Sequence, residues 1–142
     1  MNPPPPRTAL RAGLWLLAVS LPLGLTLEAL HAWKVNVYLG SAMRRELWTL
    51  AHAHGNLLGI LCLAMAAVAD KLGPDPVRCQ RRERWLVAGA WAMPLGFLVG
   101  GVLNREGDPS FGIVLVPIGG VLVFVALVQA ALAARCSATA AR

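Results

Sequence analysis

The residues best suited to chemistry in this chain are histidines placed inside apolar sequence. His52 and His54 lie in the stretch 47–56, which opens an apolar run, and His31 closes the preceding apolar run, three residues after Glu28. Titratable or metal-binding groups in a hydrophobic segment cost free energy, so they mark candidate functional positions. The chain has 3 histidines in all, and a functional hypothesis from sequence rests on them and on Glu28.

Three kinds of chemistry fit these residues. Two histidines on facing helices can supply the axial imidazoles of a haem, for example haem b, and His31, His52 and His54 are the candidate ligands. Imidazoles and a carboxylate can instead hold a transition metal, with Glu28, His31 and His52 as the candidate set. Glu28 could also handle protons, alone or with a quinone and a histidine. A purely structural role for all four groups is the remaining alternative, and the sequence leaves it open.

Helical geometry limits what these residues can do together. Glu28 and His31 are three residues apart and project from one face of a helix. His52 and His54 are two residues apart, which places them about 200° apart around a helix. They therefore cannot both bind one metal on an undistorted helix. His52 shares a stripe of small residues with Asn56 and is expected to face the interior, and His54 to face another helix, the lipid interface or a second site.

The elements that must position these residues are four apolar runs. The hydrophobic fraction is 57% and the charged fraction 14%, whereas soluble domains carry about a quarter charged residues. Each run is long enough to cross a hydrocarbon core of about 30 Å, and each carries small residues at helical spacing, which allow close helix packing in lipid. The sequence predicts an all-α polytopic membrane protein, an antiparallel four-helix transmembrane bundle. Its spans are predicted at about 12–32, 48–69, 85–103 and 110–134 within a single membrane domain, 12–134.

The ends of the chain and its charges suggest an orientation. Residues 1–11 form a proline-rich leader predicted to be disordered, and 135–142 a short basic tail. Nine of the 13 Lys and Arg residues lie in the leader, the loop before the third span and the tail. The positive-inside rule therefore predicts cytoplasmic termini. The leader and first span also resemble a signal peptide, so cleavage after the first span stays open.

Several functional classes find no support in the sequence. The net charge of +6 is explained by contact of basic loops with anionic lipid headgroups, and no basic segment is interleaved with stacking aromatics, so a nucleic-acid partner is not expected. The three cysteines form no Cys-x-x-Cys pair. No nucleotide-binding loop, nucleophile elbow or zinc-protease motif occurs, so no catalytic residue is proposed and a non-enzymatic role is favoured.

The segment 51–59, Ala-His-Ala-His-Gly-Asn-Leu-Leu-Gly, resembles small four-span bacterial membrane proteins of unassigned activity, which carry a His-x-His near the start of the second helix. A more distant similarity links it to the histidine-rich helix starts of haem–copper oxidase subunit I and of haem- and copper-linked membrane proteins of nitric oxide metabolism. The chain lacks the histidines of a complete oxidase site. The resemblance implies a bacterial inner-membrane protein and favours haem or metal binding.

The expected function follows from these observations together. The leading hypothesis is an inner-membrane protein that binds haem or a metal at an outer-side His/Glu cluster, as a redox-linked or accessory subunit. One alternative is a purely structural or assembly protein. The other is a small proton-coupled transporter that uses Glu28. The expected partners are the lipid bilayer and either a second copy of the chain or another subunit of a membrane complex.

Overall fold

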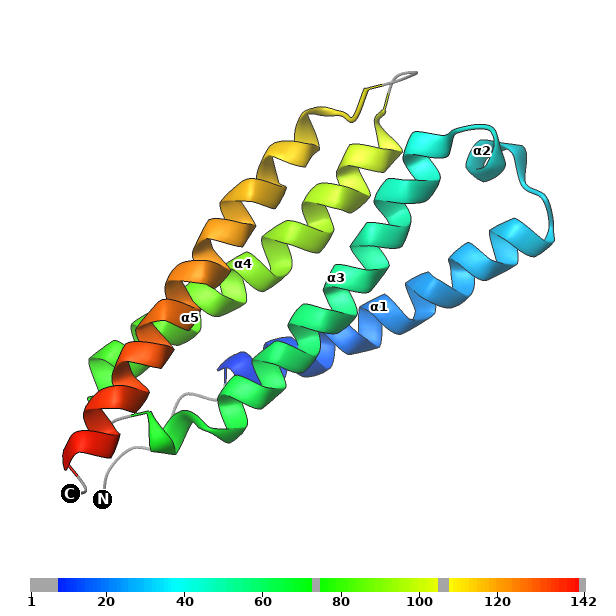
Figure 1. Cartoon of the computed structure of the whole chain (residues 1–142). Coiled ribbons are helices and arrows are strands. Elements are labelled where there is room, and N and C mark those ends of the chain that lie inside the picture. The colour runs from blue at the N-terminus through cyan, green and yellow to red at the C-terminus, as the bar shows by residue number, and fades with distance from the viewer. Residues whose placement is uncertain (1–7, 73–74, 105–107, 141–142) are drawn as a thin grey trace.

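Four long helices dominate the computed structural model, which describes residues 8–72, 75–104 and 108–140 (Figure 1). The long helices are α1 (Thr8–Ala32), α3 (Ala42–Ala67), α4 (Pro76–Val102) and α5 (Leu115–Ala140). A short helix, α2 (Asn36–Leu39), and two 3₁₀ turns, Ala69–Lys71 and Phe111–Val114, lie in the connections. The segments Thr8–Ala32, Ala42–Ala67, Pro76–Val102 and Phe111–Arg135 are long and apolar enough to cross a membrane. The predicted all-α class and multi-pass membrane layout are confirmed.

The helices pack in the order in which they follow one another along the chain. Extensive contacts join α1 to α3, α3 to α4 and α4 to α5, and α1 makes a smaller contact with α4. Glycines lie at these contacts: a methyl group on Gly13 of α1 would lie 2.8 Å from the carbonyl oxygen of Gly59 in α3. One on Gly89 of α4 would lie 2.5 Å from the carbonyl oxygen of Gly119 in α5. The predicted small residues therefore let helix backbones approach one another, as is typical of membrane helices.

The core is formed by one side of each helix, and the other side carries large apolar side chains. The main buried cluster contains Leu16, Leu58, Cys62, Leu86, Ala90, Val123 and Ala126. A smaller cluster of Leu47, Ala51 and Phe97 lies toward the connection between α1 and α3. Exposed side chains include Trp15 and Leu25 of α1 and Phe124 of α5. Large apolar groups on the outside are unfavourable in water but match a hydrocarbon solvent.

Helices α1, α3 and α4 begin earlier than the predicted apolar spans, whereas α5 begins at Leu115, after the predicted start at 110, because the 3₁₀ turn Phe111–Val114 precedes it. Ser41 caps α3 by accepting a hydrogen bond from the backbone N–H of Arg44, and Asp75 caps α4 in the same way, with Pro76 in the first helical turn. Arginine and glutamate have good helix propensity, so the polar stretches before the apolar runs join the helices once a cap is available. Helix α1 already begins at Thr8. The rest of the leader, residues 1–7, lies outside the described residues.

Candidate functional site

His52 lies at the contact between α3 and α1. Its Nδ1 is 2.7 Å from the backbone carbonyl oxygen of Ser20. Because a carbonyl oxygen only accepts, we assign the ring proton to Nδ1, which donates to Ser20 and leaves a lone pair on Nε2. The side-chain Nδ2 of Asn56 lies 3.3 Å from that Nε2 and donates a further hydrogen bond of 3.1 Å to the carbonyl oxygen of His52. The imidazole is thus held between α1 and the next turn of its own helix.

Two glycines make room for this arrangement. The imidazole of His52 rests against Gly24 of α1, and a methyl group on Gly24 would overlap the ring. Likewise, a methyl group on Gly55 of α3 would overlap the hydroxyl of Ser20. Only glycine allows helix and side chain to come this close. The sequence predicts small residues at the helix contacts, and the structure shows which side chain each of these two glycines meets.

His54 faces a different helix. Its ring centroid is 4.8 Å from that of Phe97 in α4, and its Nδ1 lies 2.9 Å from the carbonyl oxygen of Leu50 in its own helix. His52 contacts α1, whereas His54 contacts α4. The two histidines therefore point to different neighbours, as their spacing predicts.

His31 and Glu28 lie beyond His52 toward the end of α1, and both side chains are exposed. His31 makes an edge contact with Tyr38 of α2, with ring centroids 6.4 Å apart. Within residues 8–72, 75–104 and 108–140, no three His, Cys, Asp or Glu side chains lie close enough together to hold a metal ion. His52 lies opposite Ser20 and Gly24, about one turn or more from Glu28 along α1, which explains why the four groups do not gather. Their ligand role stays a prediction.

A small cavity lies close to His52 between α1, α3 and α4. It is lined by Ser20 and by apolar residues that include Ala51 and Trp91, and its volume is about 40 Å³. Small-molecule sites are commonly about 300 Å³ or larger. This cavity is therefore too small to hold a haem.

A hydrogen-bonded cluster joins the connecting segments at this end of the bundle. Arg44 donates to the carbonyl oxygen of Val37, to that of Gly101 at 3.0 Å, and to the side-chain oxygen of Asn104 at 3.1 Å. Asn104 in turn donates to the hydroxyl of Ser41 at 3.1 Å. This network was not predicted from the sequence. No pattern within one segment pairs residues some 60 positions apart.

Trp48 strengthens the same end of the bundle. Its indole N–H donates to the carbonyl oxygen of Leu98 at 3.2 Å, and its ring stacks on Tyr38 with centroids 6.1 Å apart. The guanidinium carbon of Arg44 lies 5.8 Å from the Trp48 ring centroid, within the range of a cation–π contact. Trp48 therefore connects α2, α3 and α4.

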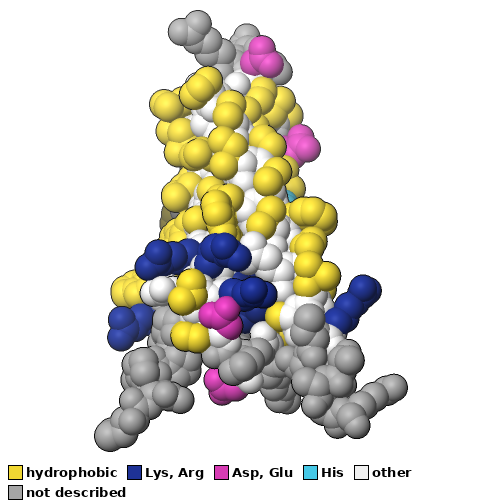
Figure 2. Space-filling view, turned by 90° about the vertical axis from the view of Figure 1, so that its left-hand side faces the viewer, with side chains coloured by type: hydrophobic (Ala, Val, Ile, Leu, Met, Phe, Trp, Pro, Cys, Tyr) yellow, Lys and Arg dark blue, Asp and Glu magenta, His cyan; other side chains and the backbone are white. Residues whose placement is uncertain are grey.

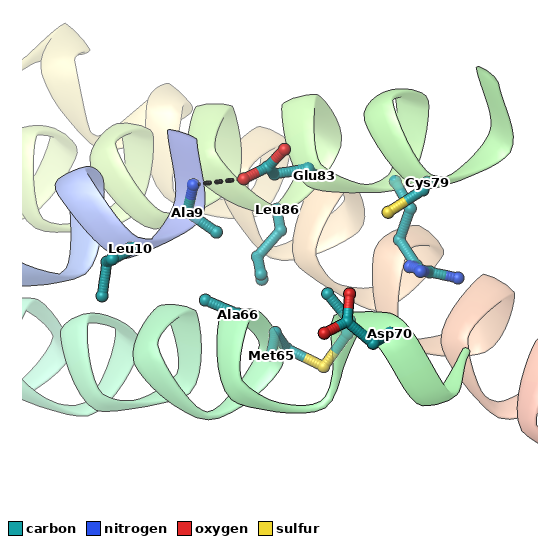
Figure 3. Close-up of a pocket in the computed structure, with 10 residues that line it drawn as sticks. Ala9, Leu10, Met65, Ala66, Asp70, Cys79, Glu83 and Leu86 are labelled. Atoms are coloured by element: carbon teal, nitrogen blue, oxygen red, sulfur yellow. Dashed lines mark hydrogen bonds between the residues drawn. The ribbon is translucent and has the colours of Figure 1, made fainter. Parts of the chain in front are cut away.

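At the opposite end, the cavity in Figure 3 lies between the start of α1, the end of α3 and the start of α4. Its volume is about 190 Å³. Glu83 of α4 accepts a hydrogen bond of 2.5 Å from the backbone N–H of Ala9 in the first turn of α1. Arg82 also lines the cavity and is only 5% exposed. The burial of Arg82 was not predicted from the sequence, although its spacing of four and seven residues from Leu86 and Gly89 places it on the inward face of α4.

Comparisons of the chain with protein-family models, with curated proteins and with solved structures found no match.

Proposed function

We propose that this chain is a multi-pass protein of the bacterial inner membrane with both termini in the cytoplasm, and that it acts as an accessory or assembly subunit rather than as an enzyme. The observation that carries the proposal is the environment of His52. Its Nδ1 is bonded to Ser20 and its Nε2 faces the side-chain amide of Asn56. Among the residues of the predicted site, His52 thus joins α3 to α1.

Other polar groups inside the helices support this role in the same way. The indole of Trp48 and the guanidinium of Arg44 both bond backbone carbonyls of α4. Glu83 of α4 bonds the backbone of α1. In lipid, where apolar burial gives no net drive for association, such bonds and close packing stabilise a helix bundle. A protein stabilised in this way provides a rigid apolar surface to neighbouring membrane components.

The proposed orientation is supported by the distribution of charge. The start of α1 and the end of α5 lie at the same end of the bundle (Figure 1). Figure 2 shows Lys and Arg side chains gathered toward one end of the face it displays, below a hydrophobic surface. The exposed arginines Arg11, Arg78, Arg81 and Arg84 belong to the segments that begin α1 and α4. The positive-inside rule favours the cytoplasm for such segments.

Cysteine labelling in spheroplasts tests this orientation. In a variant without native cysteines, Phe111→Cys should react with a membrane-impermeant maleimide, because Phe111 is 88% exposed at the end expected to face outward. Gln80→Cys, in the exposed first turns of α4, should react only after permeabilisation. The reverse pattern would contradict the proposal.

A second candidate function is ligand binding at His52, as a redox-linked subunit whose haem or metal is completed by a partner. Two observations favour it. A ring N–H donated to a carbonyl is the usual way in which a ligating histidine is oriented. In addition, the side-chain oxygen of Asn56 is buried without a hydrogen-bond partner among the described residues, and an unsatisfied buried group often marks the place of an unseen water or ligand. Binding would require the Asn56 amide to move away from Nε2.

An absorption spectrum and metal analysis separate the two candidates. The chain is purified in mild detergent from cells supplied with haem and metals, and its spectrum is recorded before and after reduction with dithionite. The accessory role predicts no Soret band and no stoichiometric metal. A Soret band that shifts on reduction, and that His52→Ala removes while His31→Ala preserves it, would instead establish the ligand role of His52.

The transporter alternative gains no support from the position of Glu28. Its side chain is exposed on α1, outside the contacts between α1 and α3. A proton-coupled site needs its carboxylate on a route between the two sides of the membrane. Glu28→Gln is accordingly expected to leave any cation resistance conferred by the protein unchanged.

A further inference from the structure

The cavity between the start of α1, the end of α3 and the start of α4 has no role in the proposed function. We therefore asked which ligand its lining residues fit. Figure 3 shows residues of α1, α3 and α4 converging on it. Apolar side chains of Leu10, Met65 and Leu86 form part of its lining, and Asp70, Arg82 and Glu83 contribute charged groups. A partly open cavity of about 190 Å³ that combines apolar walls with charges of both signs is suited to an amphipathic ligand.

Arg82 is the most unusual member of this lining. It is 5% exposed, yet within the described part of the chain it has no hydrogen bond or ion pair. Its neighbours differ: Arg81 and Arg84 are exposed, and Arg78 pairs with Asp75 at 3.1 Å. No guanidinium nitrogen of Arg82 is among the fully buried polar atoms of the described residues that lack a partner, so the guanidinium reaches the open space of the cavity that it lines. Anionic oxygens of a ligand bound in that space would give this largely buried cation a charged hydrogen-bonding partner.

The two carboxylates of the cavity, Asp70 and Glu83, limit the net charge of a ligand that can bind there. One oxygen of Glu83 already accepts the backbone N–H of Ala9, and Asp70 is exposed. Neither carboxylate makes an ion pair with Arg82 in the described residues. A ligand that carried only negative charge would satisfy Arg82 but would be repelled by Asp70 and Glu83. A ligand that carries an anion and a cation a few atoms apart satisfies both signs.

We propose that the cavity binds a phosphate ester that bears a primary ammonium group, of the phosphoethanolamine type. The planar guanidinium of Arg82 matches phosphate oxygens with two parallel hydrogen bonds. The ammonium group is directed to Asp70, and Leu10, Met65 and Leu86 contact the carbon skeleton. The exposed arginines of α1 and α4 place the cavity at headgroup depth in the proposed orientation. The ester is carried either by a membrane phospholipid or by a small soluble molecule, since the recognised group is the same.

The test is lipid binding by the full chain in detergent, measured by native mass spectrometry after delipidation. Phosphatidylethanolamine is compared with phosphatidylcholine, which lacks N–H donors, and with phosphatidylglycerol, which lacks the cation. The proposal predicts tightest binding of phosphatidylethanolamine. If soluble glycerophosphoethanolamine competes with the lipid, the natural ligand is a small soluble molecule. If it does not compete, the natural ligand is a membrane phospholipid. Equal or tighter binding of phosphatidylglycerol, or no binding of any of these molecules, would overturn the proposal.

Three variants locate the site. Arg82→Gln should weaken phosphatidylethanolamine binding by about tenfold or more, the effect of losing one charged hydrogen-bonding group. Arg81→Gln removes an exposed arginine next to it and should bind as the natural chain does. Asp70→Asn changes only an exposed side chain, so folding is not at issue, and it should narrow the preference for phosphatidylethanolamine over phosphatidylglycerol. Unchanged affinity in Arg82→Gln, or an unchanged preference in Asp70→Asn, contradicts the proposal.

Discussion

The Nδ1 of His52 lies 2.7 Å from the carbonyl oxygen of Ser20. This hydrogen bond joins α3 to α1 and fixes the tautomer and orientation of the imidazole. It requires Gly24, because any larger residue there would overlap the ring. Side-chain bonds between membrane helices contribute about 0.6–2 kcal/mol each, so the histidine, the serine carbonyl and the glycine stabilise the contact as one unit.

Gly24→Ala is expected to destabilise the protein. The added methyl group would overlap the His52 imidazole, and overpacking of this kind costs about 1–3 kcal/mol. Thermal unfolding in detergent, followed by circular dichroism, measures the effect as a lower Tm.

Two controls separate the clash from a general effect of alanine. Gly120→Ala places a methyl group in α5 with no atom within 4 Å, so its better helix propensity should leave Tm unchanged or raise it. In the His52→Ala background the ring is absent, and Gly24→Ala should then cost little. An equal loss of Tm in both backgrounds would show that the ring does not occupy this position.

Arg44→Lys is expected to lower Tm by several degrees. The guanidinium binds two backbone carbonyls and Asn104 from three directions, which a single ammonium group cannot reproduce. Its loss should cost about 1–3 kcal/mol. The matched control is Arg45→Lys, because the Nε of Arg45 has no hydrogen-bond partner among the described residues. If both substitutions had the same effect, the network around Arg44 would not be the cause.

Glu83→Ala is expected to loosen the start of α1. The carboxylate of Glu83 satisfies a backbone N–H in the first turn, where a helix has no internal acceptors and carries partial positive charge. A lost cap costs about 1 kcal/mol, so hydrogen exchange at the amides of residues 9–12 should become about fivefold faster. Glu46→Ala, which changes an exposed glutamate of α3, should leave this exchange unaltered. Faster exchange throughout the molecule would point to global destabilisation instead.

Lys34→Gly is expected to stabilise the turn after α1. Lys34 has a φ of 51°, a left-handed conformation that costs a residue with a Cβ about 1 kcal/mol or more relative to glycine. The turn has the hydrogen bonds of a glycine-type helix end, from Lys34 N–H to His31 and from Val35 N–H to Leu30. A rise in Tm is expected for Lys34→Gly but not for Lys34→Ala, which loses the charge and keeps the strain. A rise in both would assign the effect to the charge.

Much of the fold could be predicted from the sequence because lipid imposes a strong constraint. Every backbone polar group in the hydrocarbon must be bonded internally, so four long apolar runs must form four helices. The N-terminal caps at Ser41 and Asp75 were harder to predict from the sequence. Because of these caps, helices α3 and α4 begin before the predicted apolar spans. The separation of His52 and His54 onto different helix faces followed from helical periodicity alone.

The candidate site was less predictable. Sequence spacing places Glu28 and His31 on one face and His52 near the same end of the bundle, but not at a particular depth. The structure pairs His52 with Ser20 and Gly24, deeper than Glu28, and leaves Glu28 and His31 exposed. The depth at which two helices meet depends on which glycines of one helix face which side chains of the other. This pairing involves segments far apart in the sequence, so the pattern within one segment does not reveal it.

The sequence by itself determined the four long helices and the faces that carry small residues, because hydrophobicity and helical periodicity act within one segment; it did not predict the short helix α2. Only the tertiary structure decided which polar groups meet. It brought Arg44 to Gly101 and Asn104, Glu83 to the start of α1, and Arg82 into a cavity without a partner among the described residues. The physical reason is that a hydrogen bond or an ion pair depends on distances of a few ångströms between segments, and these distances are set only when all helices have packed.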